Sequence, residues 1–335
     1  MSSSLPRISV IIATFNAERT LDQCLKSLTT QDYPQKLLQI IIVDGGSSDA
    51  TLQIAYKYHT EIIHVPQEKQ SAEYNKGCGA QYAKGEYILF IDYDNILPHS
   101  AWLSKMIQPH IQNPSIVAVE PLRYAYRKDH SLLDRYFALF GVNDPVPYYL
   151  HKADRLSYMY DKYNLLGKAQ EKKDYFIVTF DPKNPTRIPT LGANGFLIKK
   201  KMFDLAKSSP EQYFHIDINV DLVKKGYNSY VFIKDEIIHL TNNKLINFLK
   251  RRKYFVEHYY IKEYQNRRYN VYMDEDFWPL VLYIVYSLSL VKPIWDSLRG
   301  WIKVRDIAWF IHPLMCLAFL YIYSISIVKK WLQIR

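Results

Sequence analysis

The most constraining feature of the chain is an apolar, β-prone run at residues 87–91 that ends in two acids, Asp92 and Asp94. A continuous apolar run predicts a strand that is buried on both faces, as in a parallel sheet covered by helices. Open α/β sheets bind ligands at the carboxyl ends of their strands, where these acids fall. Paired carboxylates there are suitable ligands for Mg²⁺ or Mn²⁺. Acids also precede ordinary turns, so the pair alone leaves both interpretations open.

A second unit of this kind lies near the N-terminus. Residues 8–16 form an apolar strand that runs into a polar turn, and residues 21–28 carry leucines at helical spacing. Residues 37–43 form another buried strand that ends at Asp44 and Gly45. This order of strand, helix and strand predicts a βαβ unit, which forms one half of a nucleotide-binding α/β fold. Asp44 can accept hydrogen bonds from a base or ribose, while Gly45 permits close backbone approach.

The glycine pattern disfavours two common nucleotide sites. The string from Gly77 to Gly79 has no third glycine at the spacing of a dinucleotide fingerprint, and the chain has no phosphate-binding P-loop sequence. Dinucleotide redox chemistry and P-loop chemistry are therefore not expected.

Taken together, these strings resemble the family 2 glycosyltransferases, which are inverting enzymes with the GT-A fold. The family's opening pattern matches residues 13–16, its Val-Asp-Gly-x-Ser-x-Asp-x-Thr signature matches residues 43–51, and its metal-binding Asp-x-Asp matches residues 92–94. Residues 191–199 look like the loop and strand that line the sugar site. The resemblance covers roughly residues 5–240 and implies an α/β fold, namely a Rossmann-like nucleotide-binding domain with a mixed, mainly parallel sheet.

The resemblance also assigns residues to three sites. The nucleotide is expected to contact Thr14, Asn16, Asp44, Gly45, Asn75 and Asp92. The expected ligands of Mn²⁺ or Mg²⁺ are Asp92, Asp94 and His239. The donor sugar and the acceptor are expected near Gly192, Asn194 and Gly195.

An inverting transfer also needs one general base to take the proton of the acceptor hydroxyl. The family's acidic motif maps best onto Asp217, with His215 and Asp221 as other registers. Asp217 and Asp221 also fit polar positions of an ordinary helix, and a lone histidine such as His239 often has a structural role. The sequence departs from the family at residues 73–75, which read Glu-Tyr-Asn where the family often has Ala-Arg-Asn, so an arginine that contacts the diphosphate is not assumed.

Charge is concentrated in the C-terminal part of the chain. Residues 1–240 carry 28 Lys+Arg against 26 Asp+Glu, whereas residues 241–335 carry 15 against 7, a net of +8. Basic and apolar residues alternate at helical spacing in residues 244–268, which indicates a helix on an anionic membrane surface or one packed on the catalytic domain. No nucleic-acid recognition motif accompanies this charge, so nucleic acid is not an expected partner.

Two uncharged runs follow, of 15 residues at 277–291 and 22 residues at 307–328. At about 1.5 Å per residue, only the second is long enough for a hydrocarbon core of about 30 Å. A membrane hairpin is slightly favoured over in-plane helices. The expected divisions are a GT-A catalytic domain at 1–240, basic amphipathic juxtamembrane helices at 241–276 and a hydrophobic membrane-attachment region at 277–335.

The sequence therefore predicts a membrane-anchored enzyme that transfers a sugar from a nucleotide sugar to a lipid-linked acceptor, such as a polyprenyl phosphate or a lipid-linked glycan. Residues 1–7 lack the apolar core of a signal peptide, and three cysteines without a disulfide pattern fit a reducing compartment, so the cytoplasmic face of the cell membrane is expected. The alternatives are a sugar nucleotidyltransferase, whose glycine-rich signature is missing, and an inactive nucleotide-sugar-binding scaffold on the membrane.

Overall fold

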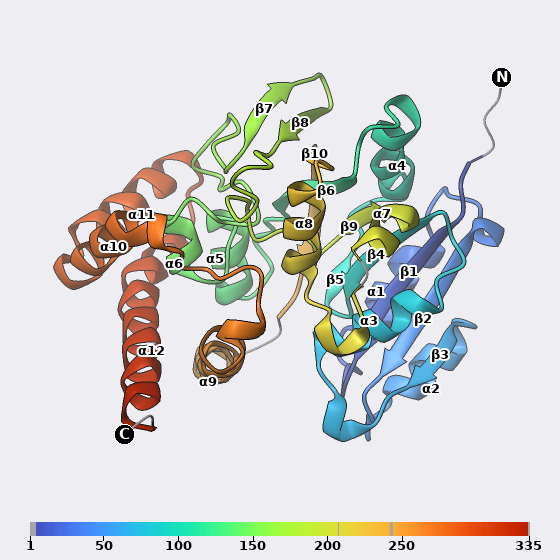
Figure 1. Ribbon diagram of the computed structural model, residues 1–335, viewed down its shortest axis with the longest axis horizontal. Coiled ribbons are helices and arrows are strands. Elements are labelled where there is room, and N and C mark those ends of the chain that lie inside the picture. Colours follow the sequence, from blue (N-terminus) through green and yellow to red (C-terminus); the bar gives the residue numbers. More distant parts are fainter. Residues whose placement is uncertain (1–4, 207, 242–243, 334–335) are drawn as a thin grey trace. The chain divides into compact units, whose positions relative to one another are not determined.

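The computed structural model describes residues 5–206, 208–241 and 244–333, and these residues form two compact units (Figure 1). Unit 1 comprises the described residues of 1–125, 167–185 and 191–240. Unit 2 comprises those of 126–166, 186–190 and 241–335. Residues 126–166 thus group with the C-terminal helices rather than with the strands that precede them.

Unit 1 is built on one mixed sheet with the strand order β3-β2-β1-β4-β9-β6-β10-β8-β7, and the short β5 pairs with β10. The parallel pairings join β3, β2, β1 and β4 in sequence, and β6 to β10, while the other pairings are antiparallel. The expected mixed α/β sheet is therefore confirmed. The strands are β1 (Ile8–Thr14), β2 (Leu38–Asp44), β3 (Glu61–His64), β4 (Tyr87–Asp92), β5 (Asn95–Ile96), β6 (Ala118–Tyr124), β7 (Lys168–Glu171), β8 (Tyr175–Thr179), β9 (Phe196–Lys199) and β10 (Ser229–His239).

The apolar runs predicted as buried strands are β1, β2 and β4, and they lie side by side at the centre of the parallel part (Figure 1). Every residue of β1 is buried; β2 and β4 pair with its two edges and α3 packs against it. The register pairs Thr14 with Asp44 and Ala13 with Asp92. The carboxyl ends of the three strands therefore meet at one edge of the sheet.

Helix α3 approaches this sheet closely at Gly79. It begins after Ser71, whose hydroxyl caps the helix by accepting a hydrogen bond of 3.1 Å from the Tyr74 amide. A Cβ atom at Gly79 would lie 2.6 Å from Ile11 Cγ2, so only glycine allows this helix–strand distance. The helices of unit 1 are α1 (Leu21–Thr29), α2 (Thr51–Lys57), α3 (Ala72–Gln81), α4 (Trp102–Gln112), α7 (Lys200–Leu205) and α8 (His215–Lys224).

Unit 2 is helical and has its own apolar core. Aromatic side chains from three segments, including Phe140, Phe248 and Trp309, pack together with Met315 and Phe319 of the last helix. Its principal elements are α5 (Leu132–Phe140), α6 (Pro145–Tyr149), α9 (Leu245–Phe255), the π-helical η4 (Val256–Lys262), α10 (Phe277–Ser289), α11 (Val291–Lys303), the 3₁₀ segment η7 (Ile307–Ile311) and α12 (His312–Gln333).

The basic stretch at 244–268 forms α9 followed by η4 rather than one continuous helix. One side of α9 is packed inside unit 2, because Phe248 is buried and Arg252 forms an ion pair of 3.0 Å with the buried Asp144. The other side is exposed and presents Ile246 and Tyr254 beside the basic residues.

One helical segment in the described part of the chain, Ile307–Leu332, is long and apolar enough to cross a membrane, with a mean hydropathy of 1.9. The helices Asp274–Ser289 and Val291–Lys303 reach that length only together, and they are bent by 84° at the break between them. At about 1.5 Å per residue the first is about 24 Å long and the second about 20 Å, and both are short for a hydrocarbon core of about 30 Å.

Two glycines at helix ends provide a stability test of this packing. Gly141 and Gly226 both have a left-handed backbone, with φ of +72° and +87°. A Cβ atom at Gly141 would lie 2.4 Å from the Arg155 carbonyl oxygen, whereas a Cβ atom at Gly226 would meet nothing within 4 Å.

We expect Gly141→Ala to lower the free energy of unfolding by about 3 kcal/mol and Gly226→Ala by about 1 kcal/mol. Both variants place a Cβ atom on a left-handed backbone, which is strained, but only Gly141→Ala also places that atom against a backbone carbonyl oxygen. Urea unfolding followed by circular dichroism measures both values. Equal losses in the two variants would contradict the close packing at Gly141.

Candidate active site

The loops that follow β1 and β2 are joined by reciprocal hydrogen bonds. The Asn16 amide donates to Ser47 Oγ at 2.9 Å, and the Ser48 amide donates to Asn16 Oδ1 at 3.0 Å. Asn16 has a φ of +50°, a conformation that asparagine tolerates better than most residues. The Thr51 hydroxyl accepts a hydrogen bond of 2.7 Å from the Ala17 amide. The two predicted nucleotide loops therefore form one continuous surface at the sheet edge.

Asp44 is fully buried at the base of this surface. Its carboxylate accepts hydrogen bonds from the Gly46 and Ser47 amides at 3.0 and 2.9 Å, from the Ser47 hydroxyl at 2.6 Å and from the Thr14 hydroxyl at 3.1 Å. These four bonds fix the loop shape from within. The predicted contact between Asp44 and a base or ribose stays a prediction. Gly45 does allow a close approach, in this case by the Gln70 side chain.

Helix α3 places two polar side chains under the same edge. The Asn75 amide group donates to the Val43 carbonyl oxygen at 3.2 Å, and its buried Oδ1 has no hydrogen-bond partner among the described residues. The neighbouring Lys76 is also buried, and its ammonium lies 2.5 Å from Asp92 Oδ1. Asp92, predicted as a metal and nucleotide ligand, is therefore paired with a lysine.

Lys76 belongs to a line of charges that reaches the first turn of α8. The Glu73 carboxylate accepts hydrogen bonds from His215 Nδ1 at 2.8 Å and from the His215 amide at 3.1 Å. Burial alone would raise the pKa of the Glu73 carboxyl, but His215 and Lys76 lower it to about 2. Burial alone would lower the pKa of the Lys76 ammonium, but Asp92 and Glu73 raise it above its ordinary value. The side chains of Asp92, Lys76, Glu73 and His215 therefore form one network of ion pairs and hydrogen bonds.

Sequence reasoning assigned no role to Lys76. The available signal was its position within the matched segment 75–77 and three residues after Glu73, which puts both residues on one face of α3. A lysine on a helix is usually exposed, so its burial beside the metal motif was not evident from the sequence.

The second acid of the metal motif, Asp94, faces His239. Their closest atoms, Asp94 Oδ1 and His239 Nε2, lie 3.6 Å apart. The loop is pinned to β10, because the Leu240 amide donates to the Asp94 carbonyl oxygen at 2.9 Å and β5 pairs with β10. Asp94 Oδ1 is buried and has no hydrogen-bond partner within the described residues. An anionic oxygen in that state fits a cation ligand.

The described residues contain no cluster of three or more His, Cys, Asp or Glu side chains that is able to hold a metal ion by itself. Asp94 and His239 provide two of the three predicted ligands. Mg²⁺ and Mn²⁺ sites commonly use few protein ligands and complete their shells with water and substrate phosphates, so the donor set fits such an ion.

The glycine loop at residues 191–195 lies between the metal motif and α8. The Gly195 amide donates to the Phe90 carbonyl oxygen of β4 at 2.9 Å, and Asn194 Nδ2 donates to the Tyr124 hydroxyl at 2.8 Å. The Tyr124 ring stacks on His239 with centroids 5.3 Å apart. A Cβ atom at Gly192 would lie 2.8 Å from the His215 carbonyl oxygen. The predicted sugar loop, metal motif and base segment are thus neighbours.

Two residues of α8 remain candidates for the base. Asp217 lies in the first turn and is only 1% exposed. His215 is oriented by Glu73 through Nδ1, which leaves Nε2 for another proton acceptor or donor. A histidine held by a carboxylate is a common arrangement of general bases.

A site with these parts can bind a diphosphate with a divalent cation and deprotonate a hydroxyl. The sequence model of the glycosyl transferase family 2 matches residues 9–182, which is more than half of the chain. The chain belongs to glycosyltransferase family 2. The family resemblance is therefore confirmed.

Similar proteins extend this assignment. Glycosyltransferase AglE of Haloferax volcanii is 33% identical over 109 residues, which is 31% of this chain and 36% of AglE. A GalNAc(5)-diNAcBac-PP-undecaprenol beta-1,3-glucosyltransferase of Campylobacter jejuni is 34% identical over 109 residues, or 31% of this chain and 34% of the relative. The matched segment thus spans about a third of these curated relatives.

The fold is shared with the mannosyltransferase PcManGT from Pyrobaculum calidifontis, solved with GDP-Man and Mn²⁺. The TM-score is 0.53 at 14% identity, and the match covers 98% of this chain and 89% of PcManGT. The expected GT-A fold with C-terminal helices is thereby confirmed.

The depressed pKa of Glu73 predicts a pH dependence of stability. Its folded-state value is about 2 against an ordinary value of 4.5, so the unfolded chain binds the extra proton between these values. The contribution of Glu73, about 3 kcal/mol, is complete above about pH 4.5 and is lost as the pH falls toward 2.

We therefore expect Glu73→Gln to lower the free energy of unfolding clearly at pH 6 and far less at pH 3. Urea unfolding at the two pH values measures the difference, with Glu68→Gln as an exposed control. The same loss at both pH values would contradict the ion-pair network.

Proposed function

We propose that the protein is an inverting glycosyltransferase that moves a sugar from a nucleotide-diphosphate donor to a lipid-linked acceptor at the cytoplasmic face of the cell membrane. The observation that carries the proposal is the convergence of Asp94, His239, the glycine loop at 191–195 and the start of α8. The acceptor class is supported by the name of the Campylobacter jejuni relative, which specifies an undecaprenol-linked acceptor. A polyprenyl phosphate or a lipid-linked glycan meets this description.

The donor nucleotide is assigned to the joined loops of β1 and β2. Thr14, Asn16, Gly45 and Asn75 line or support this surface, and the unpartnered Asn75 Oδ1 is an acceptor for a ligand donor. Asp44 contributes by fixing the loop. A nucleoside can thus be recognised without a dinucleotide fingerprint.

Asp94 and His239 would hold Mn²⁺ or Mg²⁺, with Asp92 beside them. When bound, the cation stabilises negative charge on the departing diphosphate. Lys76 is the nearest cation of the chain to Asp92 and balances its charge. Gly192, Asn194 and Gly195 shape the sugar site on the other side.

The base is assigned to Asp217, which takes the proton from the acceptor hydroxyl as that oxygen attacks the anomeric carbon and the bond to the diphosphate breaks. Family position supports this choice. His215 is the second candidate, because its Glu73 partner leaves Nε2 available.

Membrane attachment is assigned to unit 2. Large apolar side chains are exposed on all three C-terminal helices, among them Leu288 at 68%, Trp295 at 60% and Tyr321 at 65%. The opposite face of α12 is packed into the core through Met315 and Phe319. Helices with one packed face and one apolar face favour lying in the membrane surface over the two-span hairpin.

Two alternative functions explain the observed residues less well. A nucleotidyltransferase needs a glycine-rich signature that the sequence lacks. An inactive scaffold has no need for the buried Lys76 and Glu73 to be linked to His215 beside the metal motif. Release of nucleoside diphosphate from a panel of nucleotide sugars, with and without membrane lipid extract, separates the three. Lipid-stimulated release supports the proposal, whereas pyrophosphate release or no release contradicts it.

Asp217→Asn keeps the size of the side chain and removes its basicity, so turnover should fall about 10²-fold or more with little change in donor affinity. Turnover and donor binding are measured on the same preparation. Retained turnover in Asp217→Asn together with loss in His215→Gln would transfer the base role to His215.

For attachment, we expect the full-length protein to stay in the membrane fraction at high salt, because burial of apolar side chains is not screened. Leu288→Glu with Ile302→Glu should lower membrane partitioning about 10²-fold, since each change removes a large exposed apolar side chain from α10 or α11. Tyr56→Glu with Tyr82→Glu, at exposed positions of unit 1, is the matched control. Equal partitioning of both double variants would contradict attachment through unit 2.

A further inference from the structure

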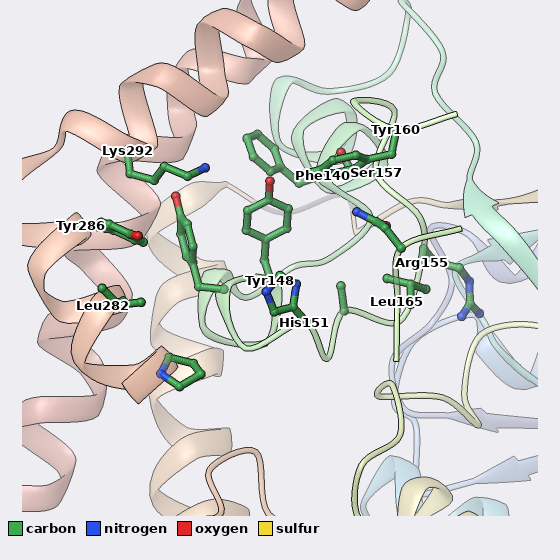
Figure 2. A pocket seen from close by; sticks show the side chains of 14 residues that line it. Phe140, Tyr148, His151, Arg155, Ser157, Tyr160, Leu165, Leu282, Tyr286 and Lys292 are labelled. Atoms are coloured by element: carbon green, nitrogen blue, oxygen red, sulfur yellow. The ribbon is translucent and has the colours of Figure 1, made fainter. Parts of the chain in front are cut away.

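Unit 2 contains a cavity of about 230 Å³ that the proposed transfer reaction does not use (Figure 2). It lies among the end of α5, α6 and the segment that follows α6, together with α10 and the first turn of α11. Its walls are rich in aromatic rings. The rings are those of Phe140, Tyr148, Tyr149, Tyr160 and Tyr286.

The polar groups of the cavity are positive or neutral. Lys292, Arg155 and His151 line it together with Ser157 and Asn164, and no Asp or Glu is among its lining residues. Figure 2 shows the Lys292 side chain extending toward the side of the cavity where the Tyr148 ring lies. The Tyr286 hydroxyl and the side chains of His151 and Asn164 have no hydrogen-bond partner within the described residues. These groups are therefore available to a ligand.

A buried hydrogen-bonded chain fixes one wall. Lys292 forms an ion pair with the fully buried Asp296, which accepts a hydrogen bond of 3.1 Å from the Tyr149 hydroxyl. The same hydroxyl lies 3.0 Å from His312 Nε2, and His312 Nδ1 lies 2.9 Å from the Tyr136 hydroxyl. Such a buried polar chain stabilises the protein little but holds Tyr149 and Lys292 in one arrangement. The cavity wall is therefore preorganised.

The helices that bound the cavity also carry the exposed apolar surface. On α11, Asp296 and Ser297 are buried, whereas Val291 is 71% and Ile302 is 68% exposed. A ligand in the cavity would thus lie next to the surface assigned to the membrane.

We infer that this cavity binds the glycosyl phosphate headgroup of a membrane lipid, with the sugar ring against the tyrosine faces and the phosphate near Lys292. This inference rests on the membrane attachment in the proposed function. Tyrosine rings pack against the C–H face of a sugar while their hydroxyls bind its polar edge, and a lysine binds phosphate as a point charge. The volume is below the roughly 300–1,000 Å³ of pockets for drug-sized ligands, which fits a single headgroup rather than an oligosaccharide.

The test uses the full chain in detergent micelles with Asp94→Ala added, so that the donor site does not bind the probe. Saturation-transfer NMR titrations compare glucose 1-phosphate with methyl glucoside. We expect saturable binding of glucose 1-phosphate and at least tenfold weaker binding of the uncharged sugar, because the ion-paired hydrogen bond to phosphate is lost. Equal affinity for both probes would overturn the assignment of phosphate to Lys292.

Two variants test the location. Lys292→Gln should weaken glucose 1-phosphate binding at least tenfold, with Lys303→Gln of the same helix as the control. Tyr286→Ala removes a ring contact with Tyr149, at 5.8 Å between centroids, but no hydrogen bond of the buried chain. It should weaken binding about threefold to tenfold, with the exposed Tyr321→Ala as the control. Unchanged binding in both cavity variants would overturn the inference even if Lys292→Gln alone disturbed folding.

Vesicles identify the source of the headgroup. Phosphatidylcholine vesicles that carry a polyprenyl glucosyl phosphate should compete with glucose 1-phosphate, and plain phosphatidylcholine vesicles should not. Equal competition by phosphatidylglycerol vesicles would overturn the requirement for a sugar. These readouts need no turnover, so they are independent of the base and donor assignments.

Discussion

The arrangement of the active site depends on one buried cation, Lys76. Its ammonium is paired with Asp92 at the end of β4 and shares a charged network with Glu73, which holds His215 at the start of α8. Without this cation, the buried Glu73 carboxylate would keep only His215 as a partner and the partly exposed Asp92 carboxylate would lose its ion pair. Leaving a buried charge without its partner costs several kcal/mol. The network therefore sets the distance between the metal motif and the helix that carries Asp217. A single interaction links the leaving-group side of the site to its base side.

Each of the C-terminal helices has an inner face that is packed in the protein and an outer face that is exposed. The inner faces of α10, α11 and α12 carry the core and the polar chain through Asp296 and His312, and the outer faces expose tryptophans and aliphatic residues. A helix in this arrangement can attach to a membrane surface without crossing it. Under the proposed function, a lipid-linked acceptor would be held at this same surface, which would reduce the search for the acceptor to two dimensions.

Much of the fold could be predicted because β1, β2 and β4 are continuous apolar runs with polar ends, and such runs form buried parallel strands in most contexts. The pairing of Asp94 with His239 was also predictable, although only through the family pattern. The role of Lys76 was not, because its partners are distant in sequence and a buried lysine has no local signature. The grouping of residues 126–166 with the C-terminal helices depends on tertiary contacts such as Phe140 with Trp309, which no periodicity reports.

The central claim is that Asp94 and His239 form a cation site completed by the donor diphosphate. Titration of Mn²⁺ followed by electron paramagnetic resonance measures this directly in the presence of individual nucleoside diphosphates. The account predicts that at least one of them strengthens Mn²⁺ binding by the unmodified protein, and that Asp94→Ala weakens this binding at least tenfold while the circular dichroism spectrum is unchanged. Equal Mn²⁺ binding by the unmodified protein and Asp94→Ala would contradict the account.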